Sequence, residues 1–271
     1  MHSSLPCICI INRSKGGITI THLVAGGGLQ GLTCALTLAK AGKEVILIDA
    51  RQEIGIPTVG AGFVMKKETI EWINSLNPTN LLQIKENNSG WGLRLEWLEK
   101  FLTQKVGETG TEIFVKTRII SSEVNGNKVI LNVKGAGPGD PTTISGDCVI
   151  DCLGQQPIRP GWPGSFEVLG RKPLDDIIEW SGAISIPENI PQEWNHQGWD
   201  GNRLSFSRED GTIECWMKGK QCVPEHPNGW IEILSAHLPI DGNSVSIDQP
   251  IETGISIAQE ILNSQQSTLV P

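Results

Sequence analysis

The feature that most constrains this chain is a run of glycines directly after a stretch of β-branched and apolar residues. Residues 18–25, ITITHLVA, predict a buried strand. The next six residues, GGGLQG, fit the spacing G-x-G-x-x-G. In such a motif the first glycine allows a tight turn after the strand. The second lets a pyrophosphate approach the backbone, and the third lets the helix pack closely on the strand. We therefore expect a dinucleotide to bind along this turn, at Gly26, Gly27, Gly28 and Gly31.

The residues that follow complete one βαβ unit. The segment 32–41, LTCALTLAKA, predicts a helix, and KEVILID at 43–49 predicts a second buried strand. Asp49 ends that strand, 21 residues after Gly28 and near the roughly 20 at which an acidic residue binds ribose hydroxyls. A carboxylate at this position favours a free 2′-OH, as in FAD or NAD, over NADP.

Composition narrows the range of partners. The 271 residues carry a formal charge of -8, which disfavours nucleic acid because phosphate binding needs a basic surface. No run of about 18 apolar residues predicts a membrane span. Seven cysteines without a CxxC pair predict reduced thiols in a cytoplasmic protein and no metal site. A small molecule is therefore the expected partner.

The order of the predicted elements indicates an α/β fold with a small, antiparallel β-rich second region. Residues 158–235 are rich in tryptophan, proline and glycine, with a hairpin predicted around Asp210-Gly211. We expect four segments: an extension at 1–17, a Rossmann-like dinucleotide-binding domain at 18–157, a small substrate or cap region at 158–235, and a C-terminal segment at 236–271 that returns to the dinucleotide domain.

The stretch LVAGGGLQGLTCALTLAKAGKEVILIDAR, residues 23–51, resembles the start of FAD-dependent oxidoreductases of the aromatic hydroxylase and geranylgeranyl reductase type. The resemblance implies FAD as the cofactor and places Ala50 and Arg51 beside it. The segment QEIGIPTVGAG at 52–62 resembles a later segment of geranylgeranyl reductase-like proteins. Val59 and Ala61 stand there where those proteins often have Cys and Glu, so the role of that cysteine does not transfer.

Three later segments extend the resemblance. WGLRLEWLEKFLTQKVGETGTEI resembles the family's R-x-x-L-x-x-x-L helix, which implies that Arg94 lies near the cofactor, and the strand after it implies an adenine contact at Ile119. GDCVIDCLGQQP resembles a strand and turn that meet the dinucleotide, with the turn glycine at Gly154. The C-terminal DGNSVSIDQPIETGISIAQEIL resembles the last flavin motif, in which a glycine, here Gly254, opens a helix that points at the flavin ring.

The resemblance implies an FAD-dependent oxidoreductase of the reductase or monooxygenase type. NAD(P)H or another donor would reduce the flavin. Six of the nine tryptophans lie between residues 157 and 230, where they would build a small core or line a pocket for a hydrophobic or aromatic substrate. Two alternatives stay open: an NAD-binding enzyme of the same fold, and a non-catalytic flavin- or nucleotide-binding protein with a degenerate site. The sequence names no catalytic residue, and it does not indicate the substrate or the oligomeric state.

Overall fold

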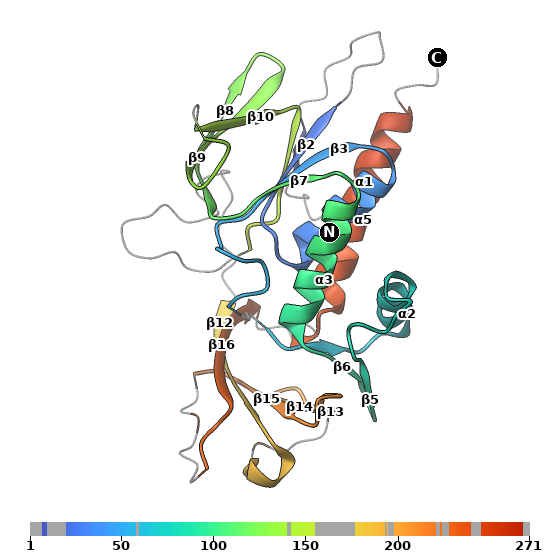
Figure 1. Cartoon of the computed structure of the whole chain (residues 1–271), viewed down its shortest axis with the longest axis vertical. Coiled ribbons are helices and arrows are strands. Elements are labelled where there is room, and N and C mark those ends of the chain that lie inside the picture. The colour runs from blue at the N-terminus through green and yellow to red at the C-terminus, as the bar shows by residue number, and fades with distance from the viewer. Residues whose placement is uncertain are drawn as a thin grey trace. The chain divides into compact units, whose positions relative to one another are not determined.

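The computed structural model describes residues 7–9, 20–57, 60–139, 142–154, 177–192, 194, 198–220, 223, 228–239 and 245–267 (Figure 1). The chain divides into two compact units. The first unit contains Met1–Ile56, Glu99–Pro173 and Pro250–Pro271, and the second contains Pro57–Leu98 and Leu174–Gln249. Each unit is therefore built from segments that are separated in the sequence, whereas each of the four expected segments is continuous. The expected domain boundaries stay a prediction.

The first unit is built on a parallel sheet. Its strands are β11 (Cys148–Asp151), β2 (Thr21–Ala25), β3 (Glu44–Ile48) and β7 (Glu112–Phe114), in that order, with β1 (Cys7–Cys9) antiparallel at the β11 edge. Helix α1 (Leu29–Lys40) connects β2 to β3. The structure therefore confirms the predicted α/β fold with its βαβ unit. Helix α1 begins three residues earlier than expected, because Leu29, Gln30 and Gly31 form its first turn.

A second sheet packs on the parallel one within the first unit. It is antiparallel and contains β10 (Thr143–Gly146), β9 (Lys128–Gly135) and β8 (Thr117–Asn125). Gly126 has a φ of 60° in the tight turn between β8 and β9, a conformation that glycine adopts at little cost. Buried side chains from both sheets form one core: Leu23, Ala25, Ile48, Ile119, Val129, Leu131, Val133, Ile144 and Val149.

Two long helices belong to both units. Helix α3 (Leu95–Glu108) passes into the first unit at Glu99, and helix α5 (Asp248–Ser267) does so at Pro250. The buried face of α3 carries Leu98, Leu102 and Val106, which follow one another at intervals of four residues, as expected for one side of a helix.

The second unit contains the antiparallel region that the sequence predicts. Its larger sheet has the order β13 (Gly198–Trp199), β14 (Arg203–Ser207), β15 (Ile213–Lys218), β12 (Ile177–Ser185) and β16 (Glu232–Pro239). The hairpin around Asp210-Gly211 joins β14 to β15, as expected. The unit also contains the strands β4 (Phe63–Val64), β6 (Gly90–Gly92) and β5 (Lys85–Asn87), the helix α2 (Lys67–Leu76) and the 3₁₀ turn η1 (Pro187–Asn189).

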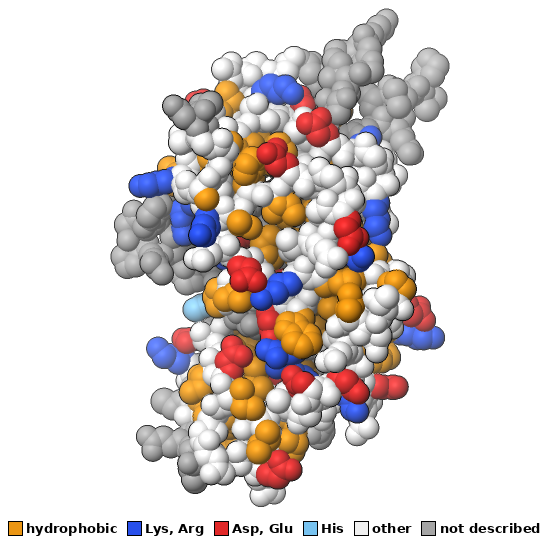
Figure 2. Space-filling view, in the orientation of Figure 1, with side chains coloured by type: hydrophobic (Ala, Val, Ile, Leu, Met, Phe, Trp, Pro, Cys, Tyr) orange, Lys and Arg blue, Asp and Glu red, His pale blue; other side chains and the backbone are white. Residues whose placement is uncertain are grey.

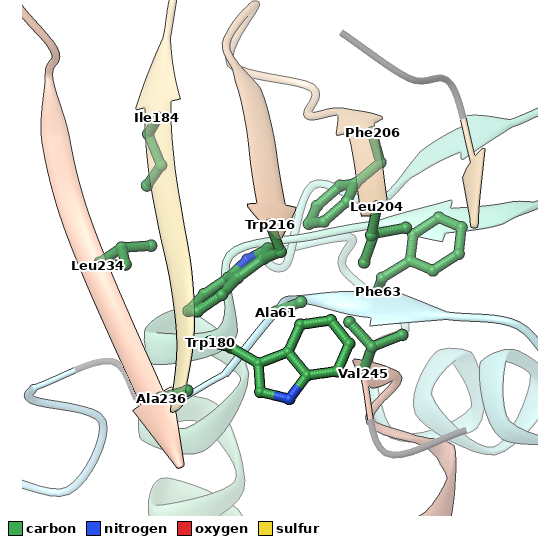
Figure 3. Close-up of a cluster of buried hydrophobic side chains, with 10 residues drawn as sticks. All are labelled: Ala61, Phe63, Trp180, Ile184, Leu204, Phe206, Trp216, Leu234, Ala236 and Val245. Carbon is green, nitrogen blue, oxygen red and sulfur yellow. The ribbon is translucent and has the colours of Figure 1, made fainter. Parts of the chain in front are cut away.

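The core of the second unit is dominated by aromatic side chains (Figure 3). Trp180 and Trp216 are both fully buried, and they pack with Phe63, Phe206 and Leu204. Of the two roles that the sequence left open for the tryptophans, these two indoles therefore build a core rather than line a pocket.

Among the described residues, Cys34, Cys152 and Cys215 form no disulfide bond, and all three are buried. Cys148 is disulfide-bonded, so the expectation of reduced thiols is wrong for that residue. No helix within the described ranges is long and apolar enough to cross a membrane. Basic and acidic side chains are interspersed on the face drawn in Figure 2.

Candidate dinucleotide site

The turn after β2 is one that only glycine can form. Gly26 has a φ of 109°, which is strained for any residue with a side chain. A Cβ at this position would lie 2.2 Å from the backbone oxygen of Cys152, the residue that follows β11. The Gly26 N–H donates a hydrogen bond of 2.8 Å to the carbonyl of Ile48 in β3. The turn is therefore fixed against both neighbouring strands.

The two other motif glycines have opposite surroundings. A Cβ on Gly31 would lie 1.8 Å from the backbone oxygen of Gly26, so this glycine lets α1 start directly against the turn. Gly28, the N-cap residue of α1, has an ordinary φ of -71°. A Cβ there would meet no atom closer than the Oε1 of Glu99, at 3.9 Å. Space beside the Gly28 backbone is what a pyrophosphate would need.

The N-terminus of α1 suits an anion. The N-cap has no side chain to cap the helix, and the first turn contains no acidic residue. The first backbone N–H groups and the positive end of the helix dipole therefore favour a negative group at this end of α1. This end of α1 lies at the carboxyl end of β2, where the chain continues to β3 on one side and returns as β11 on the other. Such a switch point is where open α/β sheets bind their ligands.

Asp49 ties the glycine turn to the end of β3. Its buried carboxylate accepts a hydrogen bond of 2.6 Å from the Gly27 N–H. It also accepts bonds from the Arg51 backbone N–H at 2.7 Å and from Arg51 Nε at 3.0 Å, while the intervening Ala50 is exposed. The structure thus places Gly27, Asp49 and Arg51 in one network, in which Asp49 already has several donors.

A second carboxylate, Glu99 from α3, joins this network. Its Oε2 accepts a hydrogen bond of 3.0 Å from Arg51 Nη1, and its side chain is 4% exposed. Burial raises the pKa of Glu99, although the nearby Arg51 and the backbone N–H of Leu29, the first residue of α1, act in the opposite direction. Burial would lower the pKa of Arg51, but its hydrogen bonds to Asp49 and the charge of Glu99 hold that pKa above its usual value.

Glu99 was not among the site residues predicted from the sequence. The signal was its position, four residues after Leu95 and three before Leu102, on the apolar side of the predicted helix. A charged residue on a buried helix face needs a partner. The pattern could therefore have predicted that Glu99 belongs to an ion pair. It could not have predicted which cation Glu99 contacts.

The end of β11 also reaches the glycine turn. The Cys152 N–H donates a hydrogen bond of 2.7 Å to the carbonyl of Ala25. Two residues later, Gly154 is exposed with a φ of 71°, and a Cβ there would meet nothing within 4 Å. The Ile119 side chain instead lies in the core between the two sheets of the first unit.

The structure places Gly254 inside a helix rather than at its start. Helix α5 begins at Asp248, and Gly254 follows more than one turn later. A Cβ on Gly254 would lie 2.0 Å from Thr33 Oγ1 and 2.3 Å from the backbone oxygen of Gln30. The glycine is therefore needed for the close packing of α5 on α1, and the expectation that it opens a helix toward the flavin ring is wrong.

Arg94 lies in the second unit, directly before α3. Its Nε is 2.5 Å from Glu96 Oε1, its Nη1 is 3.9 Å from Asp210 Oδ2, and its guanidinium stacks 4.8 Å from the Trp97 ring centre. These contacts account for its position without a cofactor, and its expected role at the dinucleotide stays a prediction.

His22 is fully buried in β2, with its Nδ1 3.1 Å from the carbonyl oxygen of Glu44. Burial lowers its pKa. His237 is half-buried in β16, whereas His196 and His226 lie outside the described residues. No group of three or more His, Cys, Asp or Glu side chains that could hold a metal ion occurs in the part of the chain that the structure describes.

The part of the chain that contains the glycine turn is similar to known proteins. Residues 23–155 match the family model for FAD dependent oxidoreductases. The digeranylgeranylglycerophospholipid reductase of Methanocella arvoryzae is 26% identical over 177 residues, which cover 58% of this chain and 45% of that reductase. The chain spans only 30% to 45% of the length of the first curated relatives that it matches.

Solved structures share the fold. A geranylgeranyl bacteriochlorophyll reductase-like protein from Thermoplasma acidophilum superposes with a TM-score of 0.63 at 18% identity, over 91% of this chain and 79% of the other. CabE, an aromatic hydroxylase from angucycline biosynthesis, superposes with a TM-score of 0.58 at 14% identity, over 91% of this chain and 63% of the other. At these identities the two likenesses establish the fold alone.

Proposed function

Because residues 23–155 place the chain in the FAD-dependent oxidoreductase superfamily, we propose that its first unit binds FAD at the turn between β2 and α1 and that the protein is an oxidoreductase. The observation that carries the proposal is the contrast among the motif glycines. Gly26 and Gly31 are required by the fold, whereas Gly28 has space beside it and caps a helix that lacks an acidic residue in its first turn.

The proposed site uses the backbone more than side chains. The pyrophosphate of FAD would approach Gly28 and the first N–H groups of α1. Asp49 would meet the ribose next to Ala50 and Arg51, and Gly154 would approach from the end of β11. FAD supplies the electron-transfer chemistry, and the residues of this chain bind and orient it. Contacts to FAD from Arg94 and Ile119 are also proposed, and only the resemblance of the sequence to FAD-dependent oxidoreductases supports them.

The substrate is proposed to be a small hydrophobic or aromatic molecule. The support comes from relatives whose names refer to geranylgeranyl groups or to aromatic hydroxylation. Buried Trp180 and Trp216 give this proposal no further support, because they belong to a core. We propose NAD(P)H as the electron donor. Anaerobic addition of NADH or NADPH tests this directly, because reduction of the flavin would bleach its absorbance.

The first test is the absorbance spectrum of the purified protein and its titration with FAD. Bands near about 375 and 450 nm that move to the supernatant after heat denaturation are expected for a non-covalent flavin. A colourless protein that takes up NAD but not FAD would support the NAD-binding alternative and overturn the proposal. A bound flavin that donors and O₂ interconvert, with no turnover of any substrate tried, would support the non-catalytic alternative.

The Gly28→Ala variant tests the location of the site. The new methyl group fits the free protein, because no atom lies closer than 3.9 Å, but it would occupy the space proposed for the pyrophosphate. We expect FAD affinity to fall at least about tenfold, an effect of about 1.4 kcal/mol, with an unchanged melting temperature. Gly107→Ala in α3, where a Cβ also meets nothing within 4 Å, is the matched control. Unchanged FAD affinity in Gly28→Ala would exclude this turn as the site.

A further inference from the structure

A buried carboxylate stands where the proposed ligand would arrive. Glu99 Oε1 is the nearest atom to the open side of Gly28, at 3.9 Å, and the N–H of Leu29 at the start of α1 favours the ionised form of Glu99. Glu99 comes from a different helix, far from the glycine motif in the chain. The N-terminus of α1 thus has an anionic partner of its own in addition to its suitability for a phosphate.

The charges of this network do not balance. Among the described residues, Arg51 is the one cation in contact with both Asp49 and Glu99, so these three ionised side chains carry one net negative charge. A pyrophosphate beside Gly28 would add further negative charge. Like charges at this distance and degree of burial oppose each other more strongly than they would in water.

We propose that Glu99 competes with the dinucleotide phosphates for the N-terminus of α1, so that binding of the dinucleotide draws one proton from solvent onto the Glu99 carboxylate. This inference rests on the proposed function. The protonated carboxyl can stay next to the phosphates as a neutral hydrogen-bond donor. Glu99 is then a residue that sets the affinity of the site and makes that affinity depend on pH.

The charged groups around Glu99 allow this protonation. From the segment after β3, Asp49 and Arg51 face it, and Asp49 disfavours its ionised form. Helix α1 contributes backbone N–H groups and no acidic side chain in its first turn. On α3 the neighbouring Lys100 is paired instead with Glu53, at 2.8 Å. Burial already favours the neutral form of Glu99, and added phosphate charge acts in the same direction.

The test is calorimetric titration of FAD into the flavin-free protein in two buffers of different ionisation enthalpy, repeated between about pH 6 and 9. The difference in heat gives the number of protons taken up for each FAD bound. We expect an uptake that approaches one proton and a Kd that rises by up to about tenfold per pH unit in that range. Glu99→Gln should take up no proton and should bind FAD at least about tenfold more tightly at pH 8.

Glu108→Gln, an equal charge change on the exposed part of α3, is the control and should keep the wild-type proton uptake. If Glu99→Gln fails to fold, the number of protons that the wild-type protein takes up for each FAD bound is sufficient to test the inference. Binding of FAD without proton uptake at any pH, or weaker binding by Glu99→Gln, would overturn the inference and leave the proposed function intact. A wild-type protein that binds no FAD at all would instead overturn the proposed function.

Discussion

Each unit of this protein contains a buried glutamate paired with an arginine, and the two pairs differ in what surrounds them. In the second unit, Glu214 is fully buried and contacts Arg208, which is 4% exposed. Glu214 also accepts hydrogen bonds from Trp216 Nε1 at 2.5 Å and from the Gly62 N–H at 3.4 Å. The aromatic core of Figure 3 includes Trp216, so this pair is balanced in charge and enclosed.

The pair in the first unit is neither balanced nor enclosed. Arg51 is shared between Glu99 and Asp49, and its side chain is 20% exposed. Beside it, the backbone of Gly28 has space for a ligand. A glutamate and an arginine thus neutralise each other in the second unit, whereas in the first unit one arginine serves two carboxylates. We expect only the second arrangement to respond to a ligand.

The largest expected effect comes from breaking the enclosed pair with Arg208→Met. It leaves Glu214 buried without its cation, so the free energy of unfolding should fall by about 3–5 kcal/mol, as measured by urea denaturation. The control is Arg203→Met, which removes a more exposed pair with Asp200 and should cost less than about 1 kcal/mol. Equal losses in the two variants would mean that enclosure does not set the strength of the Arg208 pair.

A smaller loss is expected from Arg51→Met, because water can reach part of this network. Removing the shared cation leaves two carboxylates together, and we expect a loss of about 1–3 kcal/mol. Adding Glu99→Gln to this variant should recover part of the loss by removing the repulsion. A double variant no more stable than Arg51→Met would show that Glu99 and Asp49 do not repel each other, contrary to the charge count.

The smallest effect is the pH dependence that Glu99 contributes to stability. Burial raises its pKa above the ordinary 4.5, so between these two values the folded protein holds a proton that the unfolded chain releases. Stability should therefore fall as pH rises through this window, by at most about 1.4 kcal/mol per pH unit for one proton. Glu99→Gln should remove this part of the slope in urea titrations, while the slope from Glu214, whose pKa is also raised by burial, should remain. An unchanged slope would contradict the assignment.

The sequence predicted the βαβ unit because its determinants are local. The spacing of Gly26, Gly28 and Gly31, the two apolar runs and Asp49 lie within one stretch, and each has a backbone reason for its place. Gly254 was placed wrongly for the opposite reason. A glycine within a helix and a glycine before a helix look alike in sequence, and only the contact with Gln30 and Thr33 distinguishes them.

The grouping of residues 57–98 with 174–249 was not foreseen, because no local pattern connects these segments. The connection lies in tertiary contacts such as the hydrogen bond of 2.9 Å from the Ile247 N–H to the carbonyl of Phe63. The role of Glu99 could not be predicted for the same reason, because its partner Arg51 lies on a segment far away in the sequence.

The contact between Gly254 and α1 has a consequence for how the protein is made. The ribosome synthesises α1 before the second unit, and the part of α5 that packs against Gln30 and Thr33 follows only after the whole second unit has been translated. During this time the surface of α1 that α5 covers is exposed on the nascent chain. We therefore infer that the first unit completes its folding after the second unit has been synthesised, although its glycine turn is translated before that unit.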